Sequence, residues 1–138
     1  MDIPSLKKSL IRHEGWKQKP YLDTKGKTTI GVGRNLSDVG LSPEEVDYLL
    51  ANDIDRALKD AQSQPWWHTV SGSANRSNAM VELVFNMGLP KLLTFKKALA
   101  ALEAGDFATA VVEFRNSLWA KQVSEDRVND LMAQIEHG

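Results

Sequence analysis

The 138-residue sequence contains no cysteine and no long run of apolar residues. Without cysteine the chain forms no disulfide and offers no thiol nucleophile, and synthesis in a reducing cytosol is expected. A helix that spans a bilayer needs about 20 consecutive apolar residues, so we expect no stable insertion into a membrane. Residues 1–6 show no basic segment followed by an apolar one, and we therefore expect no conventional signal peptide.

Charge of one sign is not in large excess either. The net charge is −1, which gives no general argument for a nucleic-acid partner. The charges are unevenly distributed, however, because residues 1–35 contain eight Lys and Arg but only three Asp and Glu. This basic segment could face an anionic polymer, or its lysines could serve solubility alone. The sequence leaves both interpretations open.

The first residues predict a helix that ends near Gly15. Asp2 can cap its start, and Pro4 suits its first turn. Gly15 is a typical helix stop, which places Glu14 in or just after the last turn. The helix presents its negative end there and disfavours ionisation of a carboxyl group. Because an acidic residue at this position is unfavourable for the helix, Glu14 is a candidate functional residue.

A β-hairpin is predicted over about residues 20–33. Pro20 excludes a helix, and Thr24-Lys25-Gly26 supplies the chemistry of a turn. Residues 28–32 are rich in β-branched side chains, as is typical of a strand. The glycines of Gly31-Val32-Gly33 invite comparison with a phosphate-binding loop. The third glycine and the following helix of such a loop are missing, so this alternative is rejected.

The rest of the chain predicts a loop at 34–41 followed by helices. Ser42-Pro43-Glu44-Glu45 has the pattern of a capping box with proline at the first helical position. Trp66 and Trp67 follow the first of these helices and are expected in the core rather than on a sugar-binding surface. The helices are expected over about residues 42–63, 75–87, 92–103, 107–119 and 125–136. One hairpin beside helices joined by short turns predicts an α+β fold that is mainly α-helical.

The functional prediction concerns Glu14, Asp23 and Thr29. Hydrolysis of a glycosidic bond commonly uses one carboxyl group as proton donor and a second carboxylate on the other side of the sugar. Glu14 suits the proton donor. Asp23 has polar neighbours on the hairpin and suits an ionised group that takes a proton from water or stabilises positive charge. Thr29, across the hairpin, could hold that water by a hydrogen bond.

These residues stand in segments that resemble the phage-type lysozymes, the family of the T-even phage lysozyme. The segments Tyr21–Gly26 and Thr28–Gly33, together with Glu14, are similar to the active-site region of that family. Leu83–Gly88 and Ser117–Trp119 are similar to its C-terminal lobe, in the same order along the chain. The resemblance covers most of the sequence.

The resemblance implies a lysozyme-like two-lobe fold. Residues 1–138 would form a single lysozyme domain. Its expected parts are a small β-hairpin lobe at about 13–45, a linking helix at about 42–63, and a helical lobe at about 65–138 together with the N-terminal helix.

The resemblance also implies a muramidase, which hydrolyses the β-1,4 bond between N-acetylmuramic acid and N-acetylglucosamine in peptidoglycan. The implied catalytic residues are Glu14, Asp23 and Thr29. The residues implied at the substrate cleft are Asn35, Phe85 and Asn86. No cofactor and no metal site is expected. Retention or inversion at the anomeric carbon is not decided by the residues, although the resemblance favours inversion.

The sequence departs from the family pattern in places that concern ion pairs. Arg34 stands where a histidine often follows the last glycine, and its expected partner is Asp53 on the long helix. Arg127 is a candidate partner of Glu14. The segment from Arg34 to Ser42 is shorter than in the T-even enzyme, so the small lobe is expected to be trimmed and the cleft more open.

Two other functions compete with the muramidase. A lytic transglycosylase cuts the same bond with one acidic residue and no attacking water, which leaves Asp23 and Thr29 without a role. A non-catalytic wall-binding module would retain the fold without turnover. As a muramidase, the protein is expected to be a monomeric phage or prophage endolysin with no nucleic-acid partner. It would be made in the host cytoplasm and reach the cell wall in the periplasm through a holin.

Overall fold

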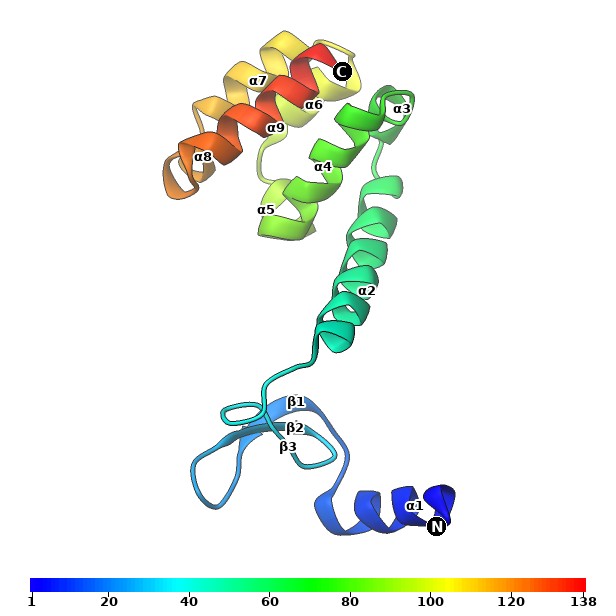
Figure 1. Ribbon diagram of the computed structural model, residues 1–138. Helices are drawn as coiled ribbons and strands as arrows, with labels where there is room; N and C mark the ends of the chain where they lie inside the picture. The colour runs from blue at the N-terminus through cyan, green and yellow to red at the C-terminus, as the bar shows by residue number, and fades with distance from the viewer. The chain divides into compact units, whose positions relative to one another are not determined.

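The computed structural model describes residues 1–138, which form nine helices and one three-stranded sheet (Figure 1). In chain order the elements are α1 (Ile3–Glu14), β1 (Lys17–Leu22), β2 (Thr28–Gly31), β3 (Arg34–Asn35), α2 (Pro43–Gln62), α3 (Trp67–Val70), α4 (Ala74–Met87), α5 (Leu89–Leu92), α6 (Lys96–Glu103), α7 (Phe107–Arg115), α8 (Leu118–Gln122) and α9 (Glu125–His137). This confirms the predicted α+β class, mainly α-helical. The contacts divide the chain into two compact units, Met1–Tyr48 and Leu49–Gly138, and α2 contributes to both.

Helix α1 begins and ends where the sequence predicts. The Asp2 carboxylate accepts hydrogen bonds from the hydroxyl of Ser5 at 2.7 Å and from its backbone N–H at 3.2 Å. These bonds hold the pKa of Asp2 below its usual value. At the other end Gly15 adopts φ 86° and donates its N–H to Ile11 O at 2.9 Å. Glycine adopts this left-handed φ without steric cost, so the helix stops at Glu14.

The sheet is antiparallel, with β2 between β1 and β3. The pairing of β1 with β2 is irregular between Lys17 and Tyr21, where Pro20 lies. Proline has no N–H to donate, which explains why the ladder is interrupted there, on an edge strand. The sequence predicted the hairpin but assigned β3 to a loop. This short strand forms because Thr29 and Ile30 of β2 pair with Asn35 and Arg34.

The start of α2 confirms the predicted capping box. The Ser42 hydroxyl accepts the N–H of Glu45 at 3.2 Å, and the Glu45 carboxylate accepts the N–H of Ser42 at 2.9 Å. Two N–H groups of the first turn are satisfied in this way. No helix of the chain has both the length and the apolar character that crossing a lipid bilayer would require.

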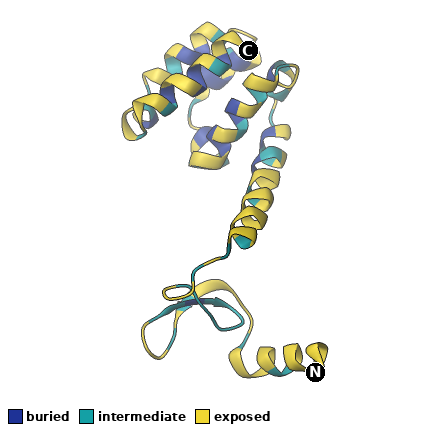
Figure 2. Cartoon of the chain, in the orientation of Figure 1, coloured by how far each residue is buried: buried dark blue, intermediate teal, exposed yellow.

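The second unit contains the hydrophobic core. Helix α6 packs on α7, and both α4 and α7 pack on α9. Most of the buried residues, dark blue in Figure 2, lie in these four helices, and others come from α2, α3, α5 and α8. The largest fully buried side chains are Trp66, Trp119, Phe114, Met80, Leu83, Leu92, Leu102, Leu131, Met132, Ile135 and Val70. Trp66 is therefore a core residue, as predicted, and Trp67 packs against the core from a partly exposed position.

Two predicted helices are shorter in the structure. The helix expected over 92–103 begins only at Lys96 as α6, because Phe95 has a non-helical ψ of 61°, and Leu92 is instead the last residue of α5. The Phe95 ring packs on the Phe114 ring with 6.0 Å between centroids, a contact between different helices. The helix expected over 107–119 ends at Arg115, because Ser117 is extended and its hydroxyl caps α8. Tertiary packing and a side-chain cap thus override a continuous helical pattern.

Candidate functional site

Glu14 is the last residue of α1, and its side chain lies directly against Gly33. A Cβ placed on Gly33 would come within 2.8 Å of Glu14 Oε2 and 3.2 Å of its Cδ. Gly33 also adopts φ 67°, a conformation that residues other than glycine rarely adopt. The backbone after β2 therefore needs glycine both for its conformation and for the space that the Glu14 carboxyl group occupies.

Asp23 follows β1 and is held by the turn that leads to β2. Its Oδ1 accepts the backbone N–H groups of Lys25 and Lys27, each at 2.8 Å. Its own N–H donates to Lys27 O at 2.9 Å. These bonds fix the orientation of the carboxylate. The other oxygen, Oδ2, forms no hydrogen bond with the protein.

Thr29 is the one polar residue of the chain that is buried, with 4% of its surface exposed. It lies in the middle strand, where Tyr21 of β1 and Asn35 of β3 are its cross-strand partners. Its hydroxyl donates to Lys27 O at 2.9 Å. Because that hydrogen is already donated to Lys27 O, Thr29 Oγ1 can bind a water only by accepting a hydrogen bond from it.

The backbone of Lys27 connects Asp23 and Thr29. Its N–H binds the Asp23 carboxylate, and its carbonyl accepts both the Asp23 N–H and the Thr29 hydroxyl. Sequence reasoning did not single out Lys27, and backbone bonds of this kind leave no signal in residue type. It did not assign Gly33 a contact with Glu14 either, and the Gly31-Val32-Gly33 pattern was compared with a phosphate-binding loop.

The first unit brings Glu14, Asp23 and Thr29 together around one strand. Asp23 is held by the turn that enters β2, and Glu14 lies against the turn that leaves it. The four residues of β2 span about 10 Å at roughly 3.3 Å per residue. A carboxyl group thus stands at each end of the strand, with the buried hydroxyl between them.

Arg34 forms its ion pair with Glu45. Its Nη1 lies 2.8 Å from Glu45 Oε1 and donates to Gly40 O at 3.1 Å. The hydrogen bond from Arg34 is the main cause that lowers the pKa of Glu45 to about 2. Asp53, the partner expected from the sequence, lies 3.4 Å from Arg56. The structure thus gives each of the two residues a different partner, and a direct Arg34–Asp53 pair stays a prediction.

The three residues predicted at the substrate cleft are not equally available. Both ends of the Asn35 amide are bonded to Asp38, since its Nδ2 donates at 2.9 Å and its Oδ1 accepts at 3.0 Å. Asn86 Oδ1 accepts the indole N–H of the buried Trp119 at 2.9 Å. Phe85 keeps 45% of its surface exposed. It lines a hollow of about 330 Å³ between α2 and α4.

Arg127 has its own partner within the second unit. Its Nη2 lies 3.2 Å from the Glu82 carboxylate on α4, while its Nε is buried without a hydrogen bond. The contact with Glu14 that the sequence suggested stays a prediction.

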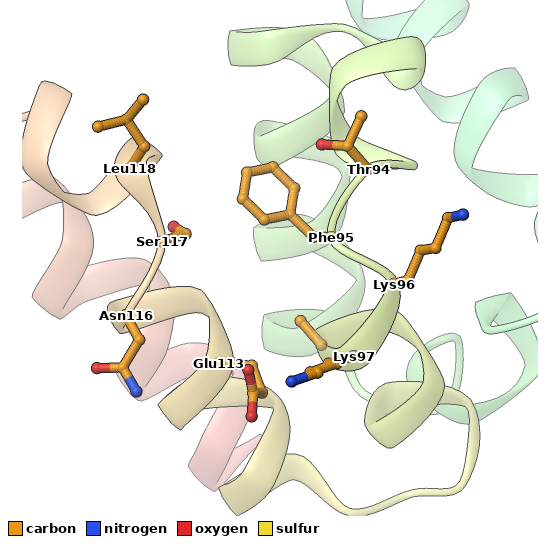
Figure 3. Close-up of a pocket in the computed structure, with 9 residues that line it drawn as sticks. Thr94, Phe95, Lys96, Lys97, Glu113, Asn116, Ser117 and Leu118 are labelled. Atoms are coloured by element: carbon orange, nitrogen blue, oxygen red, sulfur yellow. The ribbon is translucent and has the colours of Figure 1, made fainter.

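A larger hollow, of about 450 Å³, lies in the second unit where α6 and α7 meet the chain segments before α6 and α8. Figure 3 shows Phe95 and Leu118 beside it, with Lys97 and Glu113 further along the same opening. None of the predicted site residues lines this hollow.

Comparison with known proteins assigns the family. A model of the family described as "Phage lysozyme" matches residues 11–134. The chain is 30% identical to a protein named "Probable T4-type lysozyme 1" of Dictyostelium discoideum, over 99% of this chain and 96% of that protein. It is 27% identical to "Probable T4-type lysozyme 2" of the same organism, with the same coverage. A stretch of the "Pre-baseplate central spike protein Gp5" of Enterobacteria phage T4, 25% of that protein, is 29% identical over 86% of this chain. The chain belongs to the phage lysozyme family.

Proposed function

We propose that the protein is a muramidase that hydrolyses the β-1,4 bond between N-acetylmuramic acid and N-acetylglucosamine. Membership of the phage lysozyme family supports a peptidoglycan hydrolase of muramidase type. The observation that carries the specific proposal is the arrangement around β2. Asp23 and Thr29 are both bonded to the backbone of Lys27, and Glu14 lies against Gly33 at the other end of the strand.

In the proposed reaction Glu14 is the general acid. Its carboxyl proton passes to the glycosidic oxygen as the bond from that oxygen to the anomeric carbon breaks. Positive charge then develops on the sugar ring and is stabilised by the Asp23 carboxylate. A water molecule adds its oxygen to the anomeric carbon and gives up a proton to Asp23. The products are two shorter glycans, one of which ends in a reducing N-acetylmuramic acid.

Thr29 and Asp23 suit the task of orienting that water. The free Oδ2 of Asp23 and the lone pairs of Thr29 Oγ1 are both acceptors, because the Thr29 hydrogen is given to Lys27 O. A water that donates one hydrogen to each acceptor keeps an oxygen lone pair available for attack. This supports the roles of base and positioning residue for Asp23 and Thr29.

The position of the two carboxyl groups favours inversion of configuration. Inverting glycosidases separate their carboxyl groups by roughly 6.5–9.5 Å to admit a water, whereas retaining enzymes keep them about 5–5.5 Å apart. Asp23 is bonded to the backbone before β2 and Glu14 lies against the backbone after it. Carboxyl groups at opposite ends of a strand support the larger separation.

The arrangement also bears on the alternatives. A lytic transglycosylase attacks the anomeric carbon with a hydroxyl of the sugar and needs no oriented water. The bonds that fix Asp23 and Thr29 would then serve no step of the reaction. A non-catalytic wall-binding module would not need the Glu14 carboxyl group in the space that a Cβ of residue 33 would occupy.

In its biological role we propose a phage or prophage endolysin that degrades the host cell wall during lysis. It would act as a monomer on glycan strands and depend on a holin to reach them from the cytoplasm. Membership of the phage lysozyme family supports action on a cell wall.

The variant Glu14→Gln tests the proposed acid. Glutamine keeps the size of the side chain but has no acidic proton, so clearing of a peptidoglycan suspension should fall by at least about 100-fold. Thermal unfolding should stay near that of the parent protein. Clearing at the parental rate by a folded Glu14→Gln protein would exclude Glu14 as the acid.

A further inference from the structure

Six cationic side chains near the N-terminus are exposed and form no ion pair. We refer to them as the cationic surface; they are Lys7, Lys8, Arg12, Lys17, Lys19 and Lys25. The two other cations of residues 1–35 are neutralised, since Lys27 pairs with Asp38 at 3.2 Å and Arg34 pairs with Glu45 at 2.8 Å.

The three acidic residues of the same segment have other partners. Asp2 caps α1, Asp23 binds backbone N–H groups, and Glu14 lies against Gly33. None of them forms an ion pair with the cationic surface. Residues 1–35 therefore carry an excess of positive charge, although the whole chain has a net charge of −1.

Part of this charge is concentrated on one face of α1. Ser5, Lys8, Ser9 and Arg12 have the spacing of a single helix face and line a hollow of about 300 Å³. The ammonium and guanidinium groups can only donate hydrogen bonds. Such a lining fits an oxyanion better than a cation or an apolar group.

The rest of the cationic surface belongs to the hairpin that carries Asp23. Lys17 and Lys19 are in β1, and Lys25 is in the turn whose N–H groups bind Asp23. A polymer whose glycosidic bond lies at Asp23 would thus be bound by the same hairpin that carries these three cations. Peptidoglycan carries carboxylate groups on its peptide side chains, which gives it the opposite charge.

We propose that the cationic surface is a docking surface for the peptide carboxylates of peptidoglycan, beyond the bond that is cleaved. The inference rests on the proposed function, since it concerns the same polymer. Exposed charges of this kind act mainly by attracting the polymer and by speeding encounter. Docking should therefore weaken as salt screens the charges.

The test uses the full chain with Glu14→Gln, so that binding is measured without turnover. Co-sedimentation with purified peptidoglycan, stripped of attached phosphodiester polymers, is followed from low to high salt. Replacing Lys8 and Arg12 by glutamine should weaken binding about 3- to 10-fold at low salt and flatten its salt dependence. Replacing Lys17 and Lys19 by glutamine is a second, independent variant that leaves α1 intact.

The control is the double variant Lys91→Gln/Lys121→Gln, which removes the same charge from exposed positions of the second unit. Its binding should match that of the parent. Converting the peptidoglycan carboxylates to amides should abolish the difference between parent and variants.

Equal losses in the control, salt-independent binding, or unchanged binding to amidated peptidoglycan would overturn the proposal. Binding that requires the phosphodiester polymers would assign the surface to a different anion and would also overturn it. Turnover of the protein with intact Glu14 is measured in parallel. Loss of salt-sensitive docking in an active enzyme refutes this inference alone, whereas absence of turnover on any peptidoglycan refutes the proposed function.

Discussion

Replacement of Gly33 by alanine tests how the fold positions the proposed acid. The new Cβ would stand 2.8 Å from Glu14 Oε2, 3.2 Å from Cδ and 3.3 Å from Cβ. Ordinary contacts are longer by several tenths of an ångström, so the Glu14 carboxyl group has to move away. A displacement approaching 1 Å in a catalytic group can cost about 100-fold in rate. We therefore expect kcat to fall about 10- to 100-fold while KM changes little.

The same substitution strains the backbone, because Gly33 has φ 67°. An L-residue in this conformation costs about 1–2 kcal/mol. For a domain of this size that corresponds to a decrease of roughly 3–10 °C in Tm. A loss of stability alone would not identify a catalytic effect, so a control with the same strain is needed.

Gly40→Ala is that control. Gly40 has φ 66°, and a Cβ there would meet no atom within 4 Å. It should lose a similar amount of Tm and keep its kcat. The assay is initial clearing of a peptidoglycan suspension at a temperature where both variants are folded. Equal loss of kcat in both variants, or full kcat in Gly33→Ala, would refute the positioning of Glu14 by Gly33.

Two further predictions concern the hydroxyl between the carboxyl groups and the ion pair at the start of α2. Thr29→Val removes the proposed water acceptor and one hydrogen bond to Lys27 O, so kcat should fall at least about 10-fold. Thr29→Ser keeps the hydroxyl and should retain most of the parental kcat. Equal activity of the two variants would contradict the proposed role of Thr29. Because Arg34 lowers the pKa of Glu45 to about 2, the pair should stabilise the fold fully above the pKa of about 4.5 of an unperturbed glutamate. That contribution should be lost as the pH falls toward 2, so the difference in urea midpoint between parent and Glu45→Gln should shrink from pH 6 to pH 3; a constant difference would contradict the pairing.

The local structure of the first unit follows directly from its residues. Asp2, Gly15 and the Ser42 capping box act on their own helix ends, so their effects can be predicted without knowing the fold. The interruptions at Phe95 and Ser117 could not be predicted in this way. The first depends on the contact of Phe95 with Phe114, which brings together residues far apart in the sequence.

The candidate site likewise has features that the sequence predicts and features that it does not. Residue types and family resemblance identified Glu14, Asp23 and Thr29, and the structure holds them around one strand. What holds them is not visible in residue type, because the Lys27 backbone bonds and the empty space at Gly33 arise from chain geometry. The ion pair of Arg34 could not be predicted from residue type either. Glu45 was recognised as part of a capping box, but its second bond, to Arg34, requires the loop at 36–41 to fold back.

The most direct test of the proposed chemistry is mass spectrometry of purified peptidoglycan after digestion by the protein. Water held by Asp23 and Thr29 as the acceptor predicts products that end in a reducing N-acetylmuramic acid. Products with a 1,6-anhydro end would show that a sugar hydroxyl is the acceptor, as in a lytic transglycosylase, and would contradict the roles of Asp23 and Thr29. Binding without any cleavage would contradict catalysis itself and favour a wall-binding module.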